Sequence, residues 1–287
     1  MTKILMYSDL HIGANRVDLE KVKDTLKWIN DTATKEQCRY IFNLGDTFDF
    51  YNHTKSKMSL TPSMVKDLEE YGYLFKGHYI LRGNHEYNEQ GDLIDIFNMY
   101  GAIPITSPFY VSAIDTLLLP YSEEPCILEN KHYKYILGHY DVSGAKFETG
   151  FRDTNNDSVA FSGLTWDMMY IGHYHIKQQI RNNIISIGAV QSRIKTNNLE
   201  PMGITILDID TGLTTFIENP YAEYETPEER ERSSKTINID TEVKNFKLEK
   251  TGLDAIIDYT SSKRDSYDSS IVDYVKGFLE SLRKYDN

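Results

Sequence analysis

The chain has 287 residues, of which 43 are acidic and 31 are basic, giving a formal net charge of -12. This length can form one large domain, or a large domain with a small appendage, around a substantial core. The acidic balance excludes a broad basic face for nucleic acid but not a local one. The two cysteines, Cys38 and Cys126, are too few for a disulfide framework and indicate a reducing compartment.

No apolar run in the sequence approaches the roughly 20 residues that a membrane span requires. The first predicted strand begins at Lys3, and no basic and apolar leader precedes it. These two features lead us to expect a cytoplasmic protein.

Strand and helix patterns alternate in the first third of the chain. Apolar runs of strand length lie at Lys3–Tyr7, Tyr40–Asn43 and His78–Leu81. Three helices are predicted between and after them: one capped by Asp18 and ending near Thr34, one from Thr61 and Pro62 to Phe75, and one around Asp92–Tyr100. Trp28 in the first helix is expected to pack in the core. This alternation is typical of a layered α/β sheet.

Short strands follow one another from Ile103 onward, with little room for helices. They are predicted at Phe109–Ser112, Thr116–Leu119, Tyr133–Leu137, Met168–Ile171, Gln178–Arg181, Ile184–Ile187, Gly203–Asp208 and Leu213–Ile217. A long polar loop at Gly144–Gly163 is typical of a functional or mobile segment. The pattern predicts a second, more antiparallel sheet packed on the first, so the fold class is an α/β four-layer α-β-β-α sandwich of two mixed sheets.

A domain boundary is predicted near residue 222, which separates a main domain at 1–222 from an appendage at 223–287. Glu223–Ser234 is charged and poor in core residues, as linkers are. Leu253–Tyr259 could form one more strand. Ser270–Lys284 has an apolar stripe at helical spacing, which would dock either on this chain or on a partner.

Five of the predicted strands run directly into residues of metal-ligand type. Seven candidate ligands result: Asp9, His11, Asp46, Asn84, His139, His173 and His175. Ligands of open α/β sheets gather beyond the carboxyl ends of the strands, so these residues should meet at one edge. Glycine directly before four of them would let the backbone turn sharply and approach closely.

Seven nitrogen and oxygen ligands are too many for one tetrahedral ion. They suit two ions about 3.5–4 Å apart that share a carboxylate. A mixed set without thiolates favours manganese, iron or zinc over calcium or magnesium, and we expect two Mn²⁺ ions. Each motif alone is weak, because an Asp-x-His is often a surface accident and a Gly-His is usually a turn. The prediction depends on all five following apolar runs.

The five motifs D-x-H, G-D-x-x-D, G-N-H-[DE], G-H and G-H-x-H resemble the pattern of the calcineurin-like metallophosphoesterases, from Asp9 to His175. The likeness continues to about Pro220. It implies a first ion bound by Asp9, His11, Asp46 and His175. It implies a second ion bound by Asp46, Asn84, His139 and His173, with Asp46 bridging. It also implies that His85 is a catalytic residue that faces the phosphate and helps to protonate the leaving oxygen.

The residue types suit that chemistry without the resemblance. Two divalent cations lower the pKa of a shared water and neutralise a phosphodiester. A histidine that can be charged near neutral pH is a suitable proton donor to the leaving group. No covalent intermediate is required.

Local features resemble the SbcD-type DNA repair nucleases and the small subunits of large-phage recombination endonucleases. The features are the Ser-Asp-Leu-His-Ile-Gly opening at Ser8, Gly-Asp-Thr-Phe-Asp at Gly45, Gly138-His139-Tyr140 and Gly188-Ala189-Val190-Gln191. This resemblance implies a DNA exonuclease or endonuclease subunit in recombination or end processing, in the host cytoplasm if phage-encoded. It also implies an SbcC-type ABC ATPase partner, bound through C-terminal segments, and a homodimer formed through the segment around Thr61–Phe75.

Some positions depart from that pattern. Glu86 stands where aspartate is commoner, and Asp49 stands where some of these nucleases have histidine. We expect Asp49 to orient a ligand and His53 to lie on a loop surface. Affinity for DNA would come from the metals, from the partner, or from the basic residues Arg16, Arg152, Arg193 and Lys195.

Two other functions remain open. One is a phosphatase, or a phosphodiesterase for small molecules or nucleotides, of the same fold. The other is a metal-free interaction module, which the filled ligand positions disfavour.

Overall fold

The computed structural model describes residues 2–13, 18–49, 62–87, 93–126, 131–147, 151–191 and 201–224. The chain divides into a compact unit at Met1–Tyr224 and a second unit at Glu225–Asn287. The predicted linker beyond Tyr224, the predicted strand at Leu253–Tyr259 and the predicted C-terminal helix lie outside the described residues, as does His53. The domain boundary therefore stays a prediction. No helix among the described residues is long and apolar enough to cross a membrane.

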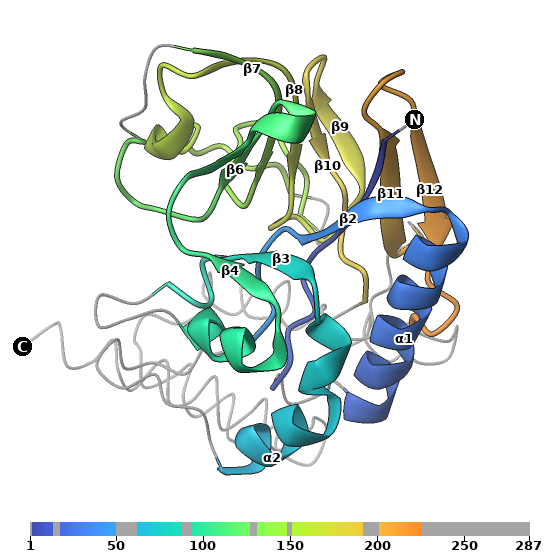
Figure 1. The fold of residues 1–287 in the computed structure, drawn as a ribbon. Helices are drawn as coiled ribbons and strands as arrows, with labels where there is room; N and C mark the ends of the chain where they lie inside the picture. Colours follow the sequence, from blue (N-terminus) through green and yellow to red (C-terminus); the bar gives the residue numbers. More distant parts are fainter. Residues whose placement is uncertain are drawn as a thin grey trace, which may run out of the picture. The chain divides into compact units, whose positions relative to one another are not determined.

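The first sheet has six strands in the order β12-β11-β1-β2-β3-β4 (Figure 1). Their bounds are β1 Lys3–Tyr7, β2 Cys38–Asn43, β3 His78–Leu81, β4 Ile103–Ile105, β11 Gly203–Asp208 and β12 Thr214–Glu218. Strands β1 to β4 are parallel, whereas β11 is antiparallel to β1 and to β12. The carboxyl ends of β1, β2 and β3 therefore lie at one edge of this sheet.

The second sheet also has six strands, in the order β5-β6-β7-β8-β10-β9. Their bounds are β5 Phe109–Val111, β6 Thr116–Leu119, β7 His132–Gly138, β8 Thr165–Ile171, β9 Gln178–Arg181 and β10 Ile184–Ser186. The four central strands are parallel, and the outer strands β5 and β9 are antiparallel to their neighbours. The fold class is confirmed as two mixed sheets of an α/β sandwich.

The prediction of a more antiparallel second sheet is wrong. Each sheet has two antiparallel and three parallel pairings. The shortage of helices suggested antiparallel strands, but β7 connects to the parallel β8 through the segment 139–164, whose described part (139–147 and 151–164) contains no α-helix. The strands at Gly203–Asp208 and Thr214–Glu218 belong to the first sheet, because β11 satisfies the backbone groups on the free edge of β1.

The helices agree with the predicted positions. Helix α1 spans Leu19–Lys35, and the Asp18 carboxylate caps it by accepting from the Glu20 N–H. Helix α2 spans Pro62–Tyr71, and the predicted helix continues to Phe75 as the 3-10 turn η1 (Gly72–Phe75). The predicted third helix is the 3-10 helix η2 at Leu93–Tyr100, and a further 3-10 turn, η3, lies at Ser112–Ile114.

Three apolar layers hold the sandwich together. The first lies between the first sheet and the helices, where Leu26 of α1 and Phe97 of η2 are fully buried and Trp28 packs at the margin. The second lies between the two sheets and includes Phe42 and Leu137. The third covers the outer face of the second sheet, where the described part of the covering layer is the 139–164 loop with the 3-10 turn η4 at Val159–Phe161.

Backbone hydrogen bonds join the two sheets near the strand ends. The Val190 N–H donates to Ser8 O at 3.0 Å, and the Tyr121 N–H donates to Arg82 O at 2.8 Å. Residues that follow strands of different sheets are thereby brought to a common edge.

Candidate metal centre

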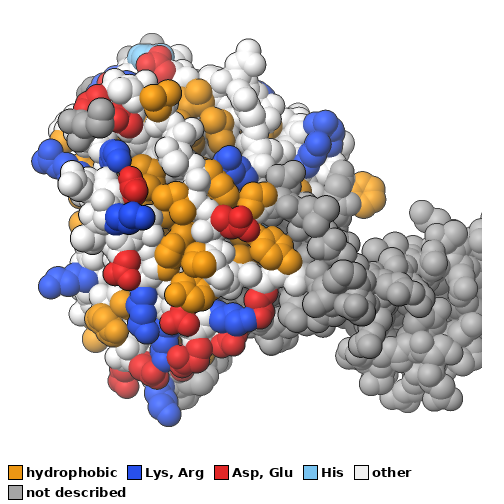
Figure 2. Space-filling model, turned by 90° about the vertical axis from the view of Figure 1, so that its right-hand side faces the viewer, with side chains coloured by type: hydrophobic (Ala, Val, Ile, Leu, Met, Phe, Trp, Pro, Cys, Tyr) orange, Lys and Arg blue, Asp and Glu red, His pale blue; other side chains and the backbone are white. Residues whose placement is uncertain are grey.

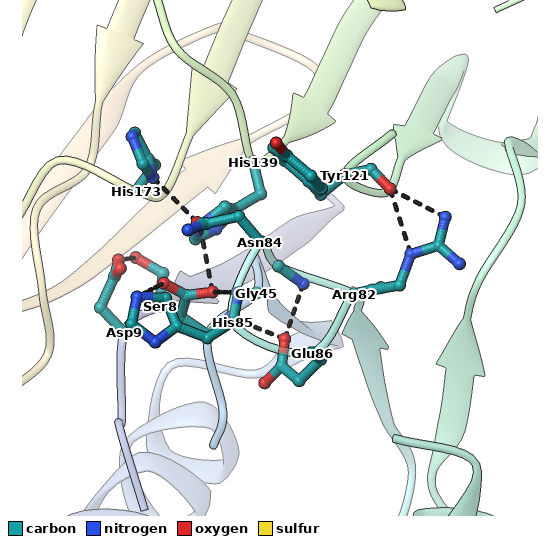
Figure 3. Close-up of polar contacts among 12 residues, drawn as sticks. Ser8, Asp9, Gly45, Arg82, Asn84, His85, Glu86, Tyr121, His139 and His173 are labelled. Carbon is teal, nitrogen blue, oxygen red and sulfur yellow. Dashed lines mark hydrogen bonds and ion pairs between the residues drawn. The ribbon is translucent and has the colours of Figure 1, made fainter. Parts of the chain in front are cut away.

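The structure brings the seven candidate ligands together at the carboxyl ends of five parallel strands. Asp9 and His11 follow β1, Asp46 follows β2 and Asn84 follows β3, whereas the three remaining histidines follow β7 and β8. Figure 3 shows Asp9, Asn84, His139 and His173 converging from both sheets. Their role as metal ligands remains a prediction, which the geometry of the two groups below supports.

Asp9, His11 and His175 form the first group. The Nε2 atoms of the two histidines lie 3.0 Å apart, and Asp9 Oδ1 lies 3.8 Å from His11 Nε2 and 3.7 Å from His175 Nε2. Atoms that each bind one ion at about 2.0–2.2 Å lie within about 4.4 Å of one another. The three atoms could therefore share a single ion.

The donors around the first group leave Asp9 Oδ1 unsatisfied. Its partner oxygen, Oδ2, accepts from the Ser8 hydroxyl at 2.5 Å, but Oδ1 is buried and has no hydrogen-bond partner among the described residues. A buried unsatisfied acceptor costs about 1–3 kcal/mol. Burial, together with the nearby His175, lowers the pKa of His11 well below its ordinary value, so His11 is neutral. A carboxylate oxygen beside a neutral imidazole is a set of atoms that fits a bound cation.

Asp46, His139 and His173 form the second group, with Asn84 between them. His139 Nε2 lies 3.3 Å from Asp46 Oδ1 and 2.9 Å from Asn84 Oδ1, and His173 Nδ1 lies 3.0 Å from Asn84 Oδ1. These distances are also short enough for one shared ion.

The other nitrogen of each ring in the second group already donates a proton. His139 Nδ1 donates to Leu44 O at 2.7 Å, and His173 Nε2 donates to Asp141 Oδ1 at 2.8 Å. A neutral imidazole carries one proton, so the nitrogen that faces the Asp46 and Asn84 oxygens presents a lone pair to them. Either a second proton or a cation must lie between these atoms, so the second group also fits a metal.

The charges around Asp46 agree with that arrangement. Burial would raise the pKa of Asp46, but His139 and His85 hold it far below its ordinary value. Burial likewise opposes a charge on His139, yet the adjacent Asp46 carboxylate outweighs it and raises the pKa of His139 to about 9. Asp46 is thus an ionised carboxylate that attracts positive charge.

His85 lies between the two groups. Its ring packs edge-on against His11 at 5.0 Å, and its Nε2 lies 3.7 Å from Asp46 Oδ2. Its Nδ1 donates to Asp49 Oδ1 at 3.0 Å. Burial lowers the pKa of His85, but Asp49 and Asp46 outweigh burial and raise it. Asp49 therefore orients His85. The resemblance implies that His85 is a catalytic residue and not a ligand. His11, Asp49 and His85 are nevertheless also close enough together to share an ion.

Four candidate ligands have a left-handed backbone. The φ angles are 59° at Asp9, 48° at His11, 52° at Asp46 and 79° at His173. Non-glycine residues rarely adopt this conformation, which costs on the order of 1–3 kcal/mol and is concentrated at functional sites. Backbone bonds hold two of these turns, because Asp9 N–H donates to Gly45 O and His11 N–H donates to Asp46 O, both at 3.0 Å.

Two glycines are required by close approach. A Cβ atom on Gly83 would lie 2.1 Å from Asp46 Oδ1, and one on Gly45 would lie 2.5 Å from His139 Nδ1. Gly45 also has a φ of 104°. Any side chain at these positions would displace a candidate ligand, as the sequence pattern indicates.

Glu86 joins two loops of the candidate site, a position that the sequence analysis did not assign to it. Its buried carboxylate accepts from the backbone N–H groups of Gly83 at 2.7 Å, Phe48 at 2.8 Å and Asp46 at 3.2 Å. Burial and the Asp46 charge raise its pKa to about 7, against the opposing effect of the bonds from Phe48 and Gly83. Glu86 fastens the loop after β2 to the loop after β3 and so positions Asp46.

Asp141 was missed altogether. It fixes the His173 ring by accepting from Nε2, and that hydrogen bond lowers the pKa of Asp141. The only available signal was its position two residues after the Gly138-His139 motif, in a loop beside the expected site.

Of the four basic residues predicted to contact DNA, Arg152 alone lies among the described residues. Arg152 is exposed and donates to Gly144 O at 3.0 Å, whereas Arg16, Arg193 and Lys195 lie outside the described residues. On the face seen in Figure 2, Lys and Arg side chains are interspersed with Asp and Glu, and the described residues in this view form no continuous basic surface. A role for these residues in binding DNA stays a prediction.

Comparison with known proteins identifies the family. The model of the calcineurin-like phosphoesterase family matches residues 2–177, which is more than half of the chain. The chain therefore belongs to the calcineurin-like phosphoesterases. Membership implies a phosphoester hydrolase that uses divalent metals. No curated protein sequence matches the chain.

Several solved structures are similar. An archaeal phosphodiesterase is 14% identical, with a TM-score of 0.39 over 76% of this chain and 99% of its own. The nuclease MPE of Pseudomonas putida is 13% identical, with a TM-score of 0.35 over 75% of this chain and 87% of its own. The phosphoesterase Yfce of E. coli is 14% identical, with a TM-score of 0.32 over 76% of this chain and 100% of its own.

Proposed function

We propose that this chain is a metal-dependent DNA nuclease that hydrolyses phosphodiester bonds at the candidate metal centre, next to His85. The observation that carries the proposal is the juxtaposition of two ligand groups, one around Asp9 and one around Asp46, with His85 between them. Both groups contain only nitrogen and oxygen donors, which favours manganese, with iron or zinc as alternatives.

Two ions would be held by this chain, one by Asp9, His11, Asp46 and His175 and the other by Asp46, Asn84, His139 and His173. Asp46 would be common to both sets. When bound, such ions supply an activated water and neutralise the charge of the phosphate.

The chain's own residues would orient the ligands and move the proton. Leu44 O and the Asp141 carboxylate hold the protons of His139 and His173 on the far side of each ring, so that the near nitrogens are free to bind. Asp49 holds His85 through Nδ1, which leaves Nε2 as the atom that would deliver a proton to the leaving oxygen. Asp49 and Asp46 favour the protonated form of His85.

DNA as the substrate is supported by the order and spacing of the motifs, which resemble those of SbcD-type nucleases. The same resemblance supports a role in recombination or end processing, a homodimer, and an SbcC-type ABC ATPase as partner. We extend these properties to the chain as part of the proposal.

The test compares substrates with the full-length protein in Mn²⁺. We expect degradation of end-labelled linear duplex and hydrolysis of bis(p-nitrophenyl) phosphate, with little release from p-nitrophenyl phosphate, a monoester. Adding a candidate ATPase would show whether endonuclease action depends on it. Preference for the monoester, with no cutting of DNA, would reject the nuclease.

A phosphodiesterase or phosphatase for small substrates is the second candidate. The formal charge of -12 favours a substrate smaller than duplex DNA. Steady hydrolysis of nucleotide or cyclic diesters, with intact duplex in the same assay, would select this alternative.

A further inference from the structure

Tyr121 follows strand β6 at the edge where the candidate ligands meet. Leu119, the last residue of β6, pairs with Gly138 of the parallel strand β7, and Gly138 directly precedes His139. The segment that leaves β6 must therefore pass beside His139. None of the five motifs contains Tyr121, so the pattern that identified the metal centre does not include it.

Hydrogen bonds lock the Tyr121 backbone to the loop that carries Asn84. The Tyr121 N–H donates to Arg82 O at 2.8 Å. In return, Arg82 Nε and Nη2 donate to Tyr121 O at 3.1 and 2.8 Å. Arg82 directly precedes Gly83 and Asn84, so any shift of Tyr121 would also disturb the second ligand group.

The Tyr121 ring is half-buried between two other tyrosines. It stacks near Tyr140 at a centroid distance of 6.1 Å and an interplanar angle of 24°, and it meets Tyr87 edge-on at 5.5 Å and 69°. The Tyr140 hydroxyl in turn donates to Pro120 O, next to Tyr121. Two neighbouring rings cover part of the Tyr121 ring, and the hydroxyl is the group of this side chain that can donate a hydrogen bond to a substrate.

The hydroxyl end of the ring lies on the same side as two of the candidate ligands. Figure 3 shows the ring beside Asn84, with its hydroxyl on the side where His139 and His173 lie. Within the described part of the chain, no hydrogen bond of this hydroxyl is found. Burial, together with the charges of Glu123, Asp141 and Asp46, raises the pKa of Tyr121 to about 12. The hydroxyl therefore keeps its proton near neutral pH and can donate it to an acceptor.

We propose that the Tyr121 hydroxyl donates a hydrogen bond to a non-bridging oxygen of the substrate's phosphate and so orients the phosphoester at the metal centre. This role of Tyr121 rests on the proposed function only because it takes the substrate to be a phosphoester. The substrate need not be DNA. An ionised phosphate oxygen is a strong acceptor for a rigidly placed neutral donor. Tyr121 would then be a substrate-binding residue outside the family motifs.

The test is Tyr121→Phe in the full chain, loaded with Mn²⁺. The substitution removes one oxygen and leaves the ring packing, so we expect unchanged thermal stability and metal content. With bis(p-nitrophenyl) phosphate, kcat/KM should fall roughly 10- to 100-fold, the loss of one hydrogen bond to a charged acceptor. Tyr110→Phe is the matched control, because Tyr110 lies on the outer strand β5 and its hydroxyl donates to Asp115, the residue after η3. A wild-type kcat/KM in Tyr121→Phe would overturn the proposal.

A binding measurement separates this proposal from the proposed function. Inorganic phosphate is titrated calorimetrically into each Mn²⁺-loaded protein, and Tyr121→Phe should bind it at least several-fold more weakly than the wild-type protein and Tyr110→Phe. If the wild-type protein hydrolyses no phosphoester, the proposed function fails while this comparison still decides the role of Tyr121. Equal phosphate affinity in all three proteins would reject that role.

Discussion

The Glu86 carboxylate accepts a 2.8 Å hydrogen bond from the backbone N–H of Phe48, 38 residues earlier in the chain. The same side chain accepts from Gly83 through its other oxygen. The loops after β2 and β3 therefore form one unit, and Asp46 belongs to that unit. A change at Glu86 should affect the candidate metal centre although Glu86 is not a predicted ligand.

Glu86→Gln should destabilise the protein and weaken metal binding. Both carboxylate oxygens accept backbone N–H groups, and the glutamine would turn an NH₂ group toward one of these donors. A buried mismatch of this kind costs about 1–3 kcal/mol, which urea unfolding followed by circular dichroism would measure. Glu124→Gln, at an exposed position, is the control. Equal unfolding midpoints for the Glu86 variant and the wild-type protein would contradict the role of Glu86.

Asp46→Ala and His85→Ala should separate metal binding from turnover. Asp46 is expected to contact both ions, so its loss should abolish metal retention and hydrolysis together. His85 is expected to act on the substrate, so its loss should leave the metal content unchanged and lower kcat by about 10²- to 10⁴-fold. Mass spectrometry of the bound metal, together with hydrolysis of bis(p-nitrophenyl) phosphate, tests both. Metal loss in His85→Ala, or retained turnover in either variant, would refute the assigned roles.

Asp141→Asn should weaken Mn²⁺ binding without unfolding the protein. The carboxylate accepts from His173 Nε2 and makes the ring a better ligand, and removal of such a partner typically lowers metal affinity 10- to 100-fold. Titration of Mn²⁺ into the metal-free protein measures this affinity. Asp167→Asn is a suitable control, because Asp167 pairs with His132 on the surface. If both variants bind Mn²⁺ equally well, Asp141 does not tune the site.

His78 should make stability dependent on pH, away from the candidate metal centre. It is buried between the Tyr7 hydroxyl and the Asn30 side chain, and burial lowers its pKa from 6.5 to about 3. Above pH 6.5 the ring is neutral in both folded and unfolded chains. Between pH 6.5 and 3 only the unfolded chain binds the proton. The free energy of unfolding should therefore fall by about 1.4 kcal/mol for each pH unit lost in that range.

Urea unfolding of the wild-type protein and His78→Gln at several pH values tests this contribution. In the variant, the free energy of unfolding should no longer contain the pH dependence that His78 contributes between pH 6.5 and 3, whatever the stability of the variant at pH 7. His132→Gln, which changes a surface histidine, should keep the wild-type slope. An identical pH dependence in His78→Gln and the wild-type protein would show that His78 does not contribute.

Much of the fold, and the positions of the candidate ligands at the strand ends, could be predicted because their signals are local. An apolar run predicts a buried strand, and the residue after it must lie at the strand's end. The cap at Asp18 and the positions of Asp9, Asn84 and His173 just after strands follow from such short-range patterns. The glycines before the candidate ligands likewise predicted a close approach of the backbone, and Gly45 and Gly83 indeed have no room for a side chain.

The partners of each strand and side chain were decided by tertiary structure. Strand β11 belongs to the first sheet because it covers the free edge of β1, about 200 residues away in sequence. The role of Glu86, the bond from His173 to Asp141 and the place of Tyr121 beside His139 also depend on contacts between loops of different strands. The sequence by itself determined which residues stand at the strand ends, because that is a local property of the chain. Only the folded structure determined which proton donors and acceptors surround them, because those groups come from distant segments.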